Sequence, residues 1–146
     1  MQHITMKHLK FKINTNLNAL ESPEGLLLKQ GLQEFNRKIL KESGSHFSIT
    51  VVDNQQVIGG LMAETCSDAF YIKLLWVHES YRKAGIASKL IDMLTEKAIM
   101  DKVYQIFTDT YGFQAQGFYE KQGFTILSTV PKYMLGHDKI YLKKDL

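Results

Sequence analysis

One short stretch, Arg82-Lys83-Ala84-Gly85-Ile86-Ala87, constrains the fold of this chain more than any other. It joins an apolar run to a stretch of helical periodicity that begins at Ser88. Its small residues let the backbone N–H groups of the turn, together with the unpaired ones in the first turn of the helix, point at one anion. Gly85 can adopt a positive φ, and Ala87 places only a small side chain at the start of the helix. The stretch therefore predicts a phosphate-binding turn between a strand and a helix.

The residues on either side of this turn predict a βαβ unit. Residues 69–77 are almost continuously apolar and too short to span a membrane, which is typical of a central strand buried on both faces. After the turn, apolar residues recur at helical spacing on one face, namely Ala87, Leu90, Ile91, Leu94 and Ala98. Residues 103–108 form the next strand, which we expect to run parallel to the first. Ligands bind where such strands end.

The N-terminal half predicts a strand, a helix and a hairpin. Residues 11–14 alternate apolar and polar, which suits a short first strand near a sheet edge. Ser22, Pro23 and Glu24 open a helix as N-cap, first position and first-turn acid. Leu28, Leu32, Phe35 and Ile39 give it one apolar face, and it should end near Ser43-Gly44.

Two strands with a polar turn between them follow. Residues 47–52 and 57–63 are rich in β-branched and apolar side chains and predict an antiparallel hairpin. Within the second strand, Gly59-Gly60 indicates a bulge or bend, the close approach of another backbone, or a ligand contact.

The C-terminal part predicts a short helix and a closing pair of strands. Ala115, Phe118 and Tyr119 share one helical face, and Gly123 stands where a helix C-cap glycine is expected. Residues 124–130 and 139–142 should pair antiparallel, with residues 131–138 as a long loop between them.

Composition excludes several classes of protein. The chain has 146 residues, 45% of them hydrophobic, and a formal net charge of +3, so we expect one ordered domain over residues 1–146. Basic and acidic residues are interspersed, which does not favour a nucleic-acid partner. The single cysteine, Cys66, allows no internal disulfide, and the five histidines show no metal-ligand spacing, so no metal is implied. Without a signal sequence or membrane span, we expect a cytoplasmic protein.

Three segments together resemble the GNAT superfamily of N-acetyltransferases: Leu75-Trp76-Val77, Arg82 to Ala87, and Phe118-Tyr119 to Gly123-Phe124. The resemblance covers roughly residues 59–146. It implies an α+β, three-layer fold, with a mixed, mostly antiparallel sheet and a central parallel βαβ unit flanked by helices.

The resemblance also implies a binding site for acetyl-CoA in a gap between the two parallel strands. The residues implied in donor binding are Leu75, Trp76, Val77, Arg82, Lys83, Ala84, Gly85, Ile86, Ala87, Ser88, Phe118 and Tyr119. The N–H of Val77 is the candidate oxyanion donor. Many family members have an asparagine seven residues before the helical tyrosine, where it contacts the cofactor or the acceptor. In this chain Gly112 stands at that position, so Thr110 or Gln114 are the candidates for that contact.

Tyr119 matches the family tyrosine that protonates the departing thiolate. A phenol with a pKa of about 10 is protonated at neutral pH and can act as an acid. Packing within the helix face is the alternative role for Tyr119. For the base, Glu79 and Glu64 are both candidates, and the alternative role of each is a solvated strand-end acid. His78 has a suitable pKa but is expected at the surface.

The resemblance therefore implies an acetyl-CoA-dependent N-acetyltransferase, in which a primary amine attacks the thioester directly in a ternary complex. The alternative is a non-catalytic acyl-CoA sensor, which would retain the groove without the acceptor chemistry. A nucleotide-binding module is disfavoured, because no Gly-Lys-Ser/Thr or Gly-x-Gly-x-x-Gly motif is present. We expect a homodimer, with residues 139–142 as a sheet edge. The acceptor stays open between a small metabolite, an antibiotic, a peptide N-terminus and a lysine.

Overall fold

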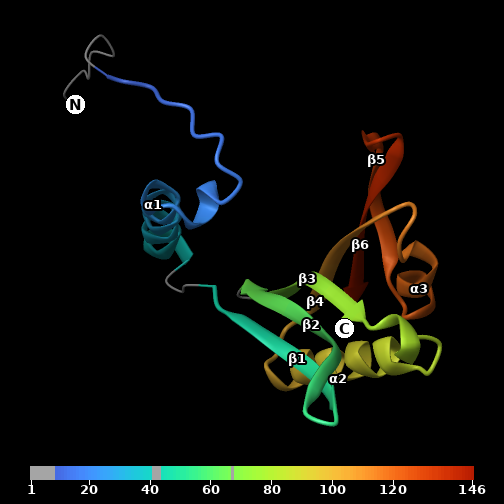
Figure 1. The fold of residues 1–146 in the computed structure, drawn as a ribbon. Coiled ribbons are helices and arrows are strands. Elements are labelled where there is room, and N and C mark those ends of the chain that lie inside the picture. The colour runs from blue at the N-terminus through green and yellow to red at the C-terminus, as the bar shows by residue number, and fades with distance from the viewer. Residues whose placement is uncertain (1–8, 41–43, 67) are drawn as a thin grey trace. The chain divides into compact units, whose positions relative to one another are not determined.

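The computed structural model describes residues 9–40, 44–66 and 68–146 (Figure 1). The chain divides into two compact units, Met1–Ser43 and Gly44–Leu146, and we describe each by itself. The single domain expected from the sequence stays a prediction. No helix in the described ranges is long and apolar enough to cross a membrane.

The N-terminal unit contains a short 3-10 helix, η2 (Ala19–Glu21), and the helix α1 (Pro23–Leu40). Ser22 caps α1 as predicted, because its Oγ accepts a hydrogen bond from the N–H of Gly25 over 3.1 Å. The described helix ends at Leu40, and the predicted end near Ser43 falls outside the described residues. The strand expected over residues 11–14 is wrong, since these residues adopt no regular structure. So short an alternation needs a neighbouring strand to complete its hydrogen bonds.

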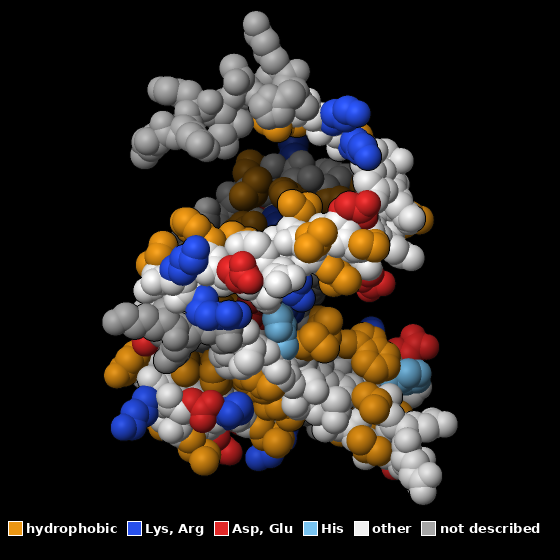
Figure 2. Space-filling view, turned by 90° about the vertical axis from the view of Figure 1, so that its left-hand side faces the viewer, with side chains coloured by type: hydrophobic (Ala, Val, Ile, Leu, Met, Phe, Trp, Pro, Cys, Tyr) orange, Lys and Arg blue, Asp and Glu red, His pale blue; other side chains and the backbone are white. Residues whose placement is uncertain are grey.

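The apolar face predicted for α1 exists but is exposed. The exposed fractions are 77% for Leu28, 62% for Leu32, 60% for Phe35 and 67% for Ile39. Figure 2 shows hydrophobic side chains at the molecular surface in orange. Among the described residues of this unit, the helix is therefore held by its backbone hydrogen bonds and its cap, and none of its own side chains is buried.

The second unit, which we call the C-terminal unit, is built on a six-stranded sheet in the order β1-β2-β3-β4-β6-β5. The strands are β1 (His46–Asp53), β2 (Gln56–Cys66), β3 (Ala69–Val77), β4 (Gln105–Tyr111), β5 (Thr125–Met134) and β6 (His137–Asp145). Among the described strands, β3 and β4 are parallel and the other neighbours are antiparallel. The expected fold class is therefore confirmed.

The helix α2 (Ile86–Met100) lies against one face of this sheet (Figure 1). It buries the predicted side chains Leu90, Ile91, Leu94 and Ala98, which are at most 1% exposed. They pack with the inner side chains of β2, β3, β4 and β6 into one core. Burial of a large apolar side chain contributes about 1.5–3 kcal/mol, so this layer fixes where the turn before α2 sits.

The β1–β2 hairpin is confirmed, with Asn54 and Gln55 at φ values of 45° and 66° in its turn. The two glycines of β2 mark close contact between backbones. A Cβ at Gly59 would lie 3.0 Å from the carbonyl oxygen of Trp76, and one at Gly60 would lie 2.6 Å from that of Ile49. Of the alternatives open for this pair, the structure shows the close backbone approach and also a bulge, because the β1–β2 register shifts at Ile58, next to Gly59.

The parallel strands β3 and β4 pair only at one end. Their pairing runs from Ala69↔Gln105 to Ile72↔Thr108 and then stops, although both strands continue. The β2–β3 register shifts at the same level, so that Lys73 bulges out of the ladder. The bulge bends β3 away from β4, and the strands splay apart.

The expectation that β3 is buried on both faces is wrong for the part of the strand beyond the bulge. Phe70 and Ile72 are buried, but Leu74 is 53% exposed and Trp76 is 47% exposed. An apolar run is compatible with either arrangement, because side chains at a ligand groove can be as apolar as those in a core.

Two predictions about the C-terminal strands are wrong. No long loop spans residues 131–138, because β5 and β6 continue and meet at Leu135 and Gly136, which have φ values of 48° and 83°. Residues 139–142 are not at an edge, since β6 lies between β4 and β5. The edge strand at this end of the sheet is β5, where Pro131 is tolerated because an edge strand can leave one side unpaired.

Candidate active site

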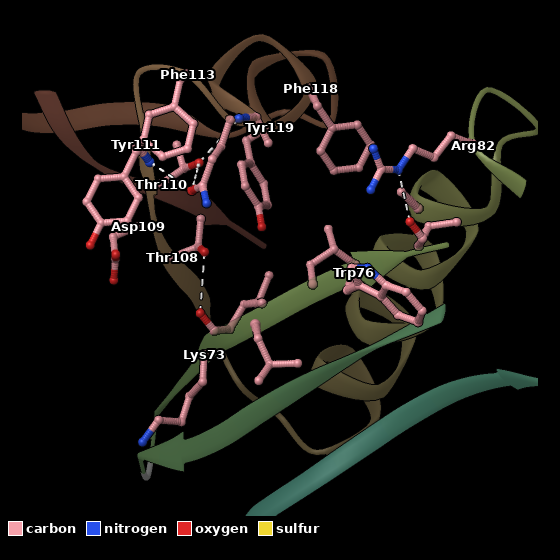
Figure 3. Close-up of a pocket in the computed structure, with 17 residues that line it drawn as sticks. Lys73, Trp76, Arg82, Thr108, Asp109, Thr110, Tyr111, Phe113, Phe118 and Tyr119 are labelled. Carbon is pink, nitrogen blue, oxygen red and sulfur yellow. Dashed lines mark hydrogen bonds between the residues drawn. The ribbon is translucent and has the colours of Figure 1, made fainter. Parts of the chain in front are cut away.

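The gap between the splayed strands opens a cavity of about 730 Å³ (Figure 3). Its walls are residues 72–77 of β3, residues 108–111 of β4, and side chains around the helix α3 (Gln116–Lys121). Two chain segments that are far apart in sequence thus form one pocket, and the end of pairing at Ile72 sets its inner limit.

The end of β3 presents backbone groups to this cavity. The N–H of His78 donates to the carbonyl oxygen of Ile58 over 2.8 Å. In an antiparallel ladder, residues that bond to one neighbour alternate with residues whose polar groups face the other side. The N–H and C=O of Val77 therefore face the gap. Arg82 Nε donates to the Val77 carbonyl oxygen over 3.0 Å, which leaves the Val77 N–H as the donor directed at the cavity.

The turn before α2 has the backbone that its sequence predicts. Lys83 and Gly85 adopt φ values of 64° and 81°, and Gly85 is the N-cap of α2. A Cβ built on Gly85 would meet no atom within 4 Å, so the space in front of it is open. A cavity of about 220 Å³ lies there and shares Val77 and Arg82 with the larger one. The two cavities form one continuous groove.

The structure brings most of the predicted donor-binding residues to this groove. Those that line the larger cavity are Leu75, Trp76, Val77, Arg82, Ala87, Thr110, Gln114, Phe118 and Tyr119. Those that line only the smaller one are Lys83, Gly85, Ile86 and Ser88. Ala84 lines neither cavity and lies exposed in the turn.

Tyr119 packs in the core and also lines the cavity, and its role as the acid stays a prediction. Its ring is 4% exposed and packs edge-on against Phe118 and Phe124, with ring centroids 5.3 Å apart in each case. Its hydroxyl end points into the cavity (Figure 3). Burial raises the pKa of Tyr119, the nearby Thr108 hydroxyl acts to lower it, and the Asp109 charge adds to the rise. The phenol therefore keeps its proton at neutral pH.

Thr110 and Gln114 organise the entrance to α3. The Thr110 hydroxyl bonds to Gln114 Oε1 over 3.2 Å and accepts from the N–H of Ala115 over 3.3 Å. Gln114 Oε1 also accepts from the N–H of Tyr111 over 3.1 Å. Both side chains line the cavity, but these atoms already have partners within the chain.

The two candidate bases lie away from the described lining of the cavity. Glu79 begins the short helix η3 (Glu79–Tyr81) and is exposed. Glu64 lies on β2, with its Oε2 3.5 Å from Lys73 Nζ and 3.8 Å from His46 Nε2. His78 accepts from the N–H of Ser80 over 3.3 Å and is exposed, as expected. The base role of Glu79 and Glu64 stays a prediction.

Sequence reasoning missed several residues that line the cavity: Lys73, Thr108, Asp109, Tyr111 and Phe113. A signal for most of them was available, because Asp109 to Phe113 follow the second parallel strand, and ligands bind at the carboxyl ends of such strands. The extent of β4 was underestimated by three residues, since it was expected to end at Thr108 and ends at Tyr111.

Comparisons with known proteins show the family of this chain. A family model described as acetyltransferase (GNAT) domain matches residues 43–126, more than half of the chain. An acetyltransferase of Agrobacterium fabrum is 34% identical over 92 residues, which are 63% of this chain and 67% of that protein. A blasticidin-S acetyltransferase of Streptomyces morookaense is 30% identical over 92 residues, which are 62% of this chain and 68% of that protein.

Solved structures share the fold. The crystal structure of an acetyltransferase from Bacillus cereus superposes with a TM-score of 0.76 at 26% identity, over 94% of this chain and 98% of that one. An aminoglycoside 6′-N-acetyltransferase complexed with coenzyme A has the same fold, with a TM-score of 0.61 at 18% identity, over 86% of this chain and 92% of that one. The chain belongs to the GNAT family and is an N-acetyltransferase.

Proposed function

We propose that this enzyme uses acetyl-CoA as donor and acetylates a primary amine by direct attack within a ternary complex. The observation that carries the proposal is the groove between β3 and β4, which combines an open backbone edge, a phosphate-binding turn and a phenol hydroxyl. The open backbone edge suits the amide-bearing pantetheine arm, the turn suits the diphosphate, and the phenol hydroxyl suits the thioester sulfur.

The groove would hold the donor along its length. Residues 75–77 would hold the pantetheine arm as an added strand, since polar backbone groups of β3 face the gap. Arg82, Lys83 and the N–H groups at the start of α2 would hold the diphosphate, because cations and a helix N-terminus both favour an anion. The open space in front of Gly85 supports this placement. The coenzyme A complex of the aminoglycoside enzyme, which has the same fold, is consistent with it.

The chemistry follows from the groups at the inner end of the groove. Acetyl-CoA supplies an activated acyl group. The lone pair of the neutral amine attacks the carbonyl carbon, a C–N bond forms, the C–S bond breaks, and the sulfur takes the Tyr119 hydroxyl proton. The proton lost by nitrogen passes to solvent, which reprotonates Tyr119. The Val77 N–H would donate to the carbonyl oxygen as negative charge develops, an effect worth about 3 kcal/mol.

Glu79 and Glu64 are kept as candidate bases for the amine proton. Since neither is among the described residues that line the cavity, each would act through water. Glu79→Gln and Glu64→Gln, compared separately, should show which carboxylate lowers kcat/KM, with the larger effect at low pH where the amine is most protonated.

The second candidate function is a non-catalytic acyl-CoA sensor. It would need the groove but no acid at its inner end, whereas the Tyr119 hydroxyl end lines the cavity. Incubation with acetyl-CoA and a panel of primary amines, with measurement of the free CoA thiol, separates the two. Release that depends on an amine supports the enzyme. Tight acetyl-CoA binding without release for any amine supports the sensor.

The amine panel should include antibiotics, because two proteins similar to this chain are named for them, blasticidin-S acetyltransferase and aminoglycoside 6′-N-acetyltransferase. It should also contain small metabolites, peptide N-termini and lysine, the other acceptors left open by the sequence. We also keep the homodimer as a proposal, with its interface moved to the edge strand β5, and the cytoplasmic location as a prediction.

A further inference from the structure

A polar cluster surrounds Asp109 on the side of β4 that faces away from Thr108. Thr108 and Thr110 are buried, at 2% and 4% exposed, and side chains alternate along a strand, so Asp109 points to the opposite face. There Asp109 Oδ1 lies 3.3 Å from Lys139 Nζ, and Oδ2 accepts a hydrogen bond from the Tyr71 hydroxyl. We call Asp109, Tyr71 and Lys139 the Asp109 cluster.

Asp109 is also one of the residues that line the groove. It follows Thr108, the last residue of β4 that pairs with β3, and it lines the cavity that Tyr119 also lines (Figure 3). Its side chain is 20% exposed, so a small molecule can reach it. Its charge is close enough to contribute to the raised pKa of Tyr119. A group bound at Asp109 would therefore share this cavity with the proposed acid.

The surroundings of Asp109 already stabilise one primary ammonium, which is that of Lys139. Lys139 Nζ lies 5.0 Å, 5.5 Å and 5.8 Å from the ring centroids of Tyr133, Tyr141 and Tyr111. Burial acts to lower the pKa of Lys139, but Asp109 and the tyrosines raise it overall. Carboxylate and ring faces are the two features that bind ammonium ions in proteins.

An aromatic wall adjoins this site within the cavity. The rings of Tyr111 and Phe113 stack in parallel with centroids 5.5 Å apart, and both residues line the cavity. Phe113 is 54% exposed, so its ring can receive a flat group from solution. His137 packs edge-on against Phe113 at 4.7 Å and supports the wall from the β5–β6 turn.

We propose that Asp109 binds the ammonium group of the acetyl acceptor, which loses one proton to solvent before its nitrogen attacks the thioester, with the planar frame that carries the amine lying against Phe113. This inference rests on the proposed function, because it names the acceptor side of the same groove. A carboxylate offers about four acceptor positions, and Tyr71 and Lys139 use two of them, so positions remain for the acceptor.

The main alternative is that the Asp109–Lys139 pair only holds β4 to β6. The two roles predict different effects when the charge of Asp109 or that of Lys139 is removed. If Asp109 binds the acceptor, Asp109→Asn weakens amine binding, whereas Lys139→Met strengthens it because the carboxylate is no longer neutralised. If the pair only stabilises the sheet, both variants should have a lower melting temperature. The amine KM should then not rise in one variant and fall in the other.

Benzylamine is the probe, because it carries a primary amine on a planar ring. In the wild type we expect CoA release with benzylamine. Asp109→Asn should raise the benzylamine KM by about 10-fold to 100-fold, the range for one charge-assisted hydrogen bond. Lys139→Met should lower it severalfold. Calorimetry should give both variants wild-type acetyl-CoA affinity, which shows that the groove is folded.

Two further variants keep the inference testable if either charge variant fails to fold. Phe113→Leu, at an exposed position, should raise the benzylamine KM about threefold through the lost ring contact. Asp145→Asn is the matched control, because Asp145 also pairs with a lysine, Lys143, over 3.0 Å but lies outside the groove, and its benzylamine KM should not change.

The outcomes separate this inference from the proposed function. If none of the amines tested, including benzylamine, leads the wild type to release CoA, the proposed function fails. The inference alone is overturned if the wild type acetylates other amines but not benzylamine, or if Asp109→Asn keeps the wild-type KM in a folded protein. An unchanged KM in Phe113→Leu also overturns the placement of the planar frame.

Discussion

Arg82 Nε donates a hydrogen bond to the carbonyl oxygen of Val77 over 3.0 Å and so joins the phosphate-binding turn to the end of β3. Both residues line both cavities of the groove. The bond occupies the Val77 carbonyl and leaves the Val77 N–H facing the gap. One side chain thus links the proposed diphosphate site to the proposed oxyanion donor.

Arg82→Met should weaken acetyl-CoA binding by about tenfold or more and also lower kcat. The change keeps the aliphatic stem but removes the bond to Val77 and a cation of the groove. Calorimetric titration and steady-state kinetics measure the two effects. Arg37→Met, in α1 of the N-terminal unit, is the control and should bind the donor as the wild type does. Unchanged binding in Arg82→Met would remove Arg82 from the donor site.

Gly85→Val should weaken acetyl-CoA binding at least tenfold while the fold is kept. The valine side chain would enter the open space in front of the turn, and a φ of 81° is strained for any residue with a Cβ. Gly136→Val is the matched control, since Gly136 has a φ of 83°, with no atom within 4 Å of its Cβ position, but lies in the β5–β6 turn. Equal donor affinity in the two variants would contradict a role of Gly85 beyond backbone strain.

Tyr119→Phe tests the acid, because it removes one oxygen and keeps the ring that packs between Phe118 and Phe124. If Tyr119 protonates the thiolate, kcat should fall by about 100-fold or more with little change in the KM for acetyl-CoA. An activated thioester, whose thiolate leaves without a proton, should restore the rate. If the ring only packs, activity stays within a fewfold and only the melting temperature changes.

The pKa of Tyr119 predicts how stability depends on pH. Burial, the first cause, raises the folded-state pKa above the unfolded value of about 10, so the protonated phenol stabilises the fold below that pH. This contribution is lost as the pH rises through the folded pKa. Urea unfolding between pH 8 and pH 11 should therefore show stability falling at the alkaline end. The fall should be smaller in Tyr119→Phe, and an identical fall in both proteins would contradict the burial argument.

A homodimer through β5 predicts a species of twice 16.8 kDa in sedimentation at micromolar concentration. The strand is a sheet edge, all of its residues are exposed, and Leu127 is 50% exposed. Leu127→Lys should give a monomer with its melting temperature nearly unchanged. Leu135→Lys, at the tip of the β5–β6 turn, is the control and should stay a dimer. A wild-type monomer at high micromolar concentration would reject the dimer.

Local sequence patterns predicted the elements that carry their own signal. The Gly85 turn, the buried face of α2 and the Ser22 cap depend on residues close in the chain, and the structure confirms each of them. Residues 11–14 and the loop over residues 131–138 were predicted wrongly. In both places the outcome depends on whether a partner strand completes the backbone hydrogen bonds, which a single segment does not encode.

The sequence by itself determined the class of the enzyme and predicted the residues of a donor site, because a phosphate-binding turn and a helical tyrosine require particular residues at fixed short spacings. The tertiary structure alone decided where the strands separate and which side chains meet there. The bulge at Lys73 opens the gap, and Asp109, Tyr71 and Lys139 come together from β4, β3 and β6. Contacts between residues this far apart in the chain depend on sheet order and register, which are set by the packing of the whole unit.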